Sequence, residues 1–65
     1  MSYEDCQKIV DATKDIFEGT NYGIDYYLDA EIYFTLNDEP IMENEVPEPL
    51  LAAFNNVVLA MDIEF

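Results

Sequence analysis

Apolar residues recur at helical spacing near both ends of the chain, and they alternate with polar residues in the middle. The spacing near the N-terminus predicts an amphipathic helix over residues 3–18. Its apolar stripe consists of Cys6, Ile9, Val10, Thr13, Ile16 and Phe17. Ser2 is suited to cap the start of this helix, with Asp5 three residues further on as in a capping box, and Gly19 is suited to end it.

The alternation in the middle is typical of strands that bury one face. Residues 22–28 and residues 31–36 both show it, with a turn expected at Asp29-Ala30. A second turn is predicted over residues 37–40, followed by a short third strand over residues 41–43. The same tyrosine-rich stretch also fits a helical stripe, so a helix there is the alternative interpretation.

A second helix is predicted from Pro47-Glu48-Pro49 onward, because proline is favoured in the first turn. Its stripe consists of Leu50, Leu51, Phe54, Val57, Val58 and Met61. The competing interpretation ends this helix at Asn55-Asn56 and makes residues 57–65 a strand. The unbroken stripe favours the helix with a short extended tail. The predicted fold class is therefore α+β: a single domain of residues 1–65, with an antiparallel sheet of two to three strands and two helices packed on one face, in the order α-β-β-(β)-α.

The net charge of the chain narrows the classes of partner that it can bind. The 65 residues include 15 Asp or Glu, two Lys or Arg and no His, which gives a formal net charge of −13. Hydrophobic residues make up 51% of the chain, too many for a disordered acidic tail. The two cations, Lys8 and Lys14, cannot form a basic patch, so the composition excludes direct binding to nucleic acid or to an anionic membrane.

The single cysteine, Cys6, cannot form an internal disulfide, and its place in the apolar stripe makes it a core thiol. A reducing cytoplasm is the simplest compartment for such a chain. The acidic start lacks the basic region of a signal peptide, and the longest uncharged run, residues 49–61, is too short to span a bilayer.

We expect no enzymatic activity, metal or cofactor. A nucleophile such as Cys6 needs an activating base, and the chain has no histidine to supply it. Gly19 and Gly23 are the only glycines, so there is no glycine-rich phosphate loop. The oxygen-rich stretch 37–45 lacks the spacing and the central glycine of the calcium-binding helix–loop–helix motif.

The distribution of the acids points to a binding surface. Twelve of them lie between Asp15 and Phe65, a segment without Lys or Arg, whereas ordinary surfaces mix both signs. Carboxylates on the outer face of a strand would recur about every 7 Å, close to the phosphate spacing along one DNA strand. The candidate partner-binding acids are Asp25, Glu31, Asp38, Glu39, Glu43, Glu45 and Glu48, followed by Glu18 and Asp29.

Tyrosines are the second candidate feature. Tyr27 and Tyr33 suit a binding surface as well as they suit the half-buried face of a strand, and both interpretations stay open. Tyr26 is expected in the core.

In size and charge, the whole chain resembles the small acidic DNA mimics with which bacteriophages counter host defences, although it shares no motif with them. These include uracil-DNA glycosylase inhibitors, antirestriction proteins and anti-CRISPR proteins. The resemblance is greatest to the anti-CRISPR group. It implies a protein in the bacterial cytoplasm that occupies the basic DNA-recognising surface of a CRISPR effector complex, so that target DNA cannot bind.

Two other interpretations belong to different functional classes. The chain could be an acidic adaptor or regulatory module that binds a basic protein without imitating DNA. It could also be a subunit that pairs through Leu59, Ile63 and Phe65, although a monomer is expected.

Overall fold

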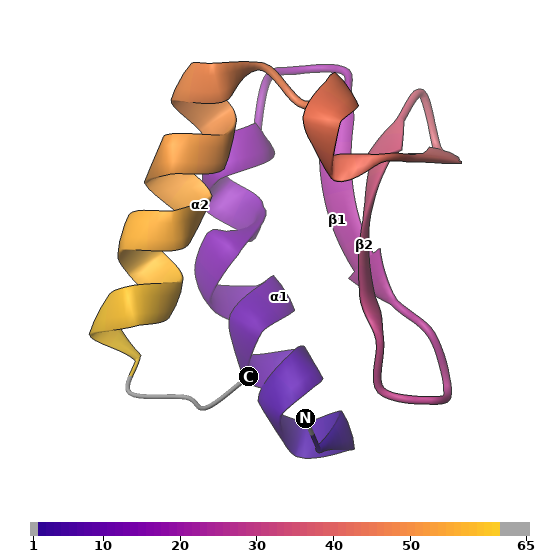
Figure 1. Ribbon diagram of the computed structural model, residues 1–65, viewed down its shortest axis with the longest axis vertical. Coiled ribbons are helices and arrows are strands. Elements are labelled where there is room, and N and C mark those ends of the chain that lie inside the picture. Colours follow the sequence, from indigo (N-terminus) through magenta and orange to yellow (C-terminus); the bar gives the residue numbers. More distant parts are fainter. Residues whose placement is uncertain (1, 62–65) are drawn as a thin grey trace.

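The computed structural model describes residues 2–61 and has two helices and three strands in the order α-β-β-β-α (Figure 1). A short 3₁₀ helix, η1, precedes the last helix. The elements are α1 (Tyr3–Phe17), β1 (Tyr22–Tyr26), β2 (Ile32–Leu36), β3 (Glu39–Ile41), η1 (Glu43–Glu45) and α2 (Glu48–Ala60). The predicted α+β class is confirmed, and the alternative of a helix in the middle of the chain is wrong.

The capping signals at both ends of α1 are confirmed. The N–H of Asp5 donates to Oγ of Ser2 at 3.1 Å. After the helix, the N–H of Thr20 donates to the carbonyl of Phe17 at 3.0 Å, which closes a tight turn. Gly19 has φ of 81° in this turn, a conformation that L-residues with a Cβ rarely adopt.

The second turn is tighter than the sequence predicted. Leu36 pairs with Glu39, so the loop between β2 and β3 contains only Asn37 and Asp38. Both loop residues have positive φ, 52° and 68°, as a two-residue hairpin turn requires, and Asn and Asp tolerate this conformation. The predicted bounds 37–40 for the turn and 41–43 for the third strand were therefore wrong.

Pro40 belongs to β3 rather than to the turn, because it lies opposite Thr35 in the ladder. In an antiparallel pair, hydrogen-bonded and non-hydrogen-bonded positions alternate, and the pair that flanks a two-residue turn is hydrogen-bonded. The next position is therefore a non-hydrogen-bonded one. Only a hydrogen-bonded position needs a backbone N–H that donates across the ladder. Proline has no N–H, so the ladder tolerates it at this non-hydrogen-bonded position.

The core lies between the sheet and the two helices, which cover the same face of the sheet (Figure 1). Phe34 in the central strand packs against Phe17 of α1 and edge-to-face against Phe54 of α2, with ring centroids 6.1 and 5.1 Å apart. Cys6 is fully buried, as predicted. Tyr26 is only half-buried, and its ring packs at the margin against the exposed Tyr3.

The apolar stripe near the C-terminus forms α2, so the competing interpretation of a strand from residue 57 is wrong up to Ala60. The N–H groups of Leu50 and Leu51 both donate to the carbonyl of Pro47, which begins the helix. The predicted extended tail at 62–65 lies outside the described residues. Within residues 2–61, neither helix combines the length and the apolar character that a membrane span requires.

Candidate partner-binding surface

A pair of stacked tyrosines lies on the sheet face opposite the helices. The rings of Tyr27 and Tyr33 are 4.1 Å apart between centroids and 21° from parallel. The hairpin brings them together, since the N–H of Tyr27 donates to the carbonyl of Glu31 at 2.8 Å. Tyr27 remains 44% exposed, so the stack offers an aromatic surface to a partner.

Asp25 lies on the same face, directly opposite Tyr33 in the ladder. Its Oδ1 accepts a hydrogen bond of 2.8 Å from the N–H of Tyr26, which limits its rotation. Desolvation raises the pKa of Tyr33, and the negative charge of Asp25 and the neighbouring Tyr27 raise it further. Tyr33 thus presents an aromatic ring beside a carboxylate, which suits an approaching cation.

A hollow of about 470 Å³ lies beside the stacked tyrosines, at the edge of the sheet where β3 ends. We call it the outer hollow. Three of the predicted acids come together in its lining with the two tyrosines. Its polar and aromatic lining consists of Tyr27, Tyr33, Glu31, Glu43 and Glu45. Its apolar lining consists of Ile32, Phe34, Pro40, Ile41 and Met42.

Backbone hydrogen bonds fix the position of Glu45 in this lining. Its Oε2 accepts from the N–H of Met42 at 2.7 Å, while its own N–H donates to the carbonyl of Met42 at 3.0 Å. This reciprocal pair starts η1 and leaves the side chain of Met42 70% exposed. Met42 could not be recognised as a surface residue from the sequence, because the predicted third strand included it.

A second hollow, of about 560 Å³, lies between β2 and α2, and we call it the inner hollow. Aliphatic and aromatic side chains make up most of its lining, and Leu59 at its rim is 81% exposed. Its lining consists of Ile32, Phe34, Glu43, Phe54, Asn55, Val58 and Leu59.

The nine predicted acids are all exposed, and they lie in two groups. One group surrounds the β1–β2 hairpin and the outer hollow: Asp25, Asp29, Glu31, Glu43 and Glu45. The other lies where α1 ends, β2 turns into β3 and α2 begins (Figure 1): Glu18, Asp38, Glu39 and Glu48.

The acids do not form a row along one strand at phosphate spacing. Asp25 is the only acid on the outer face of β1, because the alternate positions before and after it are Gly23 and Tyr27. Loops, η1, the first residue of β3 and the first residue of α2 supply the remaining carboxylates. The carboxylates make this surface negative, but they do not reproduce the regular geometry of a phosphate backbone.

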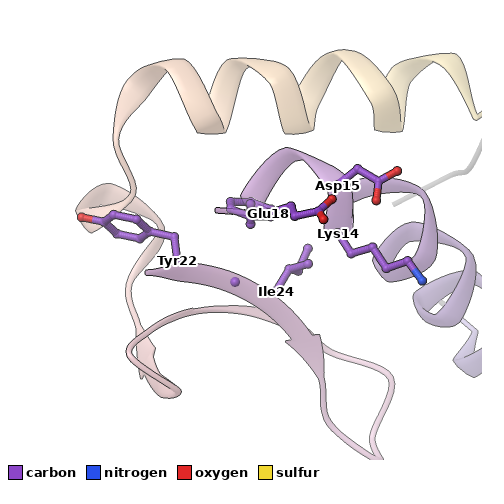
Figure 2. A pocket seen from close by; sticks show the side chains of 7 residues that line it. Lys14, Asp15, Glu18, Tyr22 and Ile24 are labelled. Atoms are coloured by element: carbon purple, nitrogen blue, oxygen red, sulfur yellow. The ribbon is translucent and has the colours of Figure 1, made fainter. Parts of the chain in front are cut away.

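The third hollow, of about 430 Å³, lies on the helix side between α1 and β1 (Figure 2). Its lining mixes signs, since Lys14 stands next to Asp15 and one turn before Glu18. Figure 2 shows the Glu18 carboxylate between the helix and the strand, while the Lys14 ammonium points away from it. This hollow therefore does not extend the acidic surface.

A metal site or relatives of known structure or function would also indicate what this surface binds. Within residues 2–61, the structure contains no group of three or more metal-ligating side chains in a suitable arrangement. No protein-family model, curated protein or solved structure matches the chain. The geometry of the stacked tyrosines, the two hollows and the carboxylates is thus the basis for a functional proposal.

Proposed function

We propose that this protein is an inhibitor that occupies the basic nucleic-acid-binding surface of a bacterial defence complex, with a CRISPR effector as the first candidate. Target DNA then cannot reach that surface. The observation that supports this best is that the charges of the sheet and its loops are all negative. Between Glu18 and Glu48 the chain carries nine exposed acids and no Lys or Arg.

Such an arrangement opposes folding of the isolated chain, which supports a role for the charges in binding a partner. Like charges on one surface repel each other, and a domain of 65 residues has little stability to spare. A basic groove on a partner would relieve this repulsion and accelerate the encounter, since complementary fields steer association. Salt should therefore weaken the complex strongly, as it does when a protein releases counterions from DNA.

The decisive experiment is capture from a bacterial lysate by the immobilised protein, with and without competing duplex DNA. A DNA mimic must lose its target when DNA is added in excess. A target retained under DNA competition would contradict mimicry and support an adaptor that binds a basic protein in another way.

Charge variants test whether the acidic surface carries the activity. The variant Glu39→Lys with Glu43→Lys should abolish capture, because it reverses one charge in each acidic group. It leaves Glu45 unchanged, since that side chain holds the Met42 N–H. The matched control is Glu4→Lys with Asp11→Lys, two exposed acids on α1 with the same change in charge. Circular dichroism should show both variants folded, and equal loss of capture in both would contradict the assignment of the surface.

A further inference from the structure

The central strand has an open edge. β2 pairs with β1 along its whole length, but it pairs with β3 only from Phe34 to Leu36. Ile32 has no partner residue in β3. Because alternate residues of an antiparallel strand direct their N–H and C=O to the same neighbour, Ile32 directs both groups to the side that β3 leaves vacant. The ladder ends at Ile41, because the chain turns into η1 from Glu43 onward.

The outer and the inner hollow meet at this open edge. They share three lining residues, Ile32, Phe34 and Glu43. Successive side chains of an extended strand point to opposite faces of the sheet. A strand laid along the edge would therefore place its side chains alternately in the outer and in the inner hollow.

The two hollows differ in the side chain that each would accept. Three carboxylates and the stacked tyrosines line the outer one, which suits a Lys or Arg side chain through charge and cation–π contact. Phe54, Val58 and Leu59 dominate the inner one, which suits an aliphatic side chain.

We propose that an extended segment of the partner protein, with alternating basic and apolar residues, adds to the sheet at this edge of β2. The added strand lies in line with β3, past the point where β3 ends. Its backbone pairs with Ile32, and its side chains alternate between the two hollows, as in other strand-addition complexes. The basic character of the partner rests on the function proposed above. A second copy of this chain fits less well, because it would bring a further charge of −13 to a rim of carboxylates.

The test uses the full-length protein labelled with ¹⁵N and short synthetic peptides with acetylated and amidated ends. One peptide alternates Lys and Val, and the second has the same composition with the lysines and valines in separate blocks. The alternating peptide should bind about tenfold more tightly than the block peptide, and it should slow hydrogen exchange at the Ile32 amide. N-methylation of alternate backbone nitrogens keeps the side chains but removes the donors, so it should abolish that protection.

Variants locate the site. Leu59→Lys places a cation at the rim of the inner hollow and should weaken the alternating peptide about tenfold. Leu28→Lys is the matched control, since Leu28 is 90% exposed and lines neither hollow. Equal weakening by both variants, equal affinity for both peptides, or unchanged exchange at Ile32 would overturn the proposal. Protection of Ile32 that grows with protein concentration in the absence of peptide would overturn it in favour of a second copy.

The two proposals fail in different experiments. If the alternating peptide binds at the edge but DNA does not displace the partner captured from lysate, strand addition stands and DNA mimicry falls. If DNA displaces the partner but the protein binds the alternating and the block peptide with equal affinity, DNA mimicry stands and strand addition falls.

Discussion

Asp25 and Tyr33 face each other across the β1–β2 ladder, so a carboxylate and a phenol share the uncovered face of the sheet. Desolvation is the main reason why the pKa of Tyr33 is raised, and the charge of Asp25 is the second. A raised pKa means that the fold favours the protonated phenol. The corresponding stabilisation is complete below the ordinary tyrosine pKa and is lost as the pH rises through the pKa of folded Tyr33.

We predict that Asp25→Asn lowers the pKa of Tyr33 towards the ordinary tyrosine value, because it removes the nearby negative charge. Ring-carbon NMR shifts followed through alkaline pH measure this titration residue by residue. Residue resolution matters because a side-chain hydrogen bond with Tyr26 also raises the pKa of Tyr3. Asp38→Asn at the far end of β2 is the control and should leave Tyr33 unchanged. An equal shift in both variants would contradict the specific role of Asp25.

Moderate salt should stabilise the isolated protein, because it screens repulsion among exposed acids that have few cations near them. We expect the melting temperature to rise by a few degrees between about 20 mM and about 300 mM salt. Circular dichroism melts in sodium chloride and in potassium chloride separate general screening from binding of one ion. A melting temperature that stays constant or falls would count against this prediction.

A side chain at Gly23 would collide with the neighbouring strand. A Cβ built there lies 2.8 Å from Oγ1 of Thr35, closer than such atoms approach in proteins. Gly23→Ala should therefore lower the free energy of unfolding by about 1–3 kcal/mol, as other overpacked sites do. Thr35→Ala removes the opposing atom, so the double variant should recover most of the loss in urea denaturation. Additive losses would show that the contact is not the cause.

Glu45 should matter more to the local structure than its exposure suggests. Glu45→Ala leaves the N–H of Met42 without its carboxylate acceptor and should cost about 0.5–1.5 kcal/mol. Glu45→Gln keeps an acceptor oxygen and is the matched variant, so it should cost less. Hydrogen exchange at the Met42 amide reports the effect directly, and equal exchange rates in the two variants would refute it.

Both helices could be predicted because their signals are local. A stripe at helical spacing together with a cap needs no knowledge of the rest of the chain, as Ser2 and its bond to Asp5 illustrate. The third strand could not be placed so well. Its bounds depend on whether Asn37 and Asp38 both adopt positive φ, and Pro40 is a turn residue by preference but lies in β3 because of the ladder position it occupies.

The sequence identified the tyrosines and the carboxylates of the candidate surface but not their arrangement. Tyr27 and Tyr33 meet because the hairpin closes through the bond from Tyr27 to Glu31, which depends on register rather than on composition. The open edge at Ile32 depends on where β3 stops. No periodicity in the sequence indicates that position, because Met42 could as well have continued the strand.

The short third strand also has a consequence for aggregation. An unpaired strand edge is a template onto which further chains can add, and proteins commonly protect such edges with charge. Here Glu31 and Glu43 line the hollow beside the open edge of β2. If both charges are removed, as in Glu31→Gln with Glu43→Gln, this protection is lost, and we expect the edge to recruit strands from other copies into a growing cross-β fibril. Thioflavin fluorescence that appears in this double variant and is suppressed by the further change Ile32→Lys would establish β2 as the seed. Fibrils of unchanged yield after that change would assign the seed to another segment.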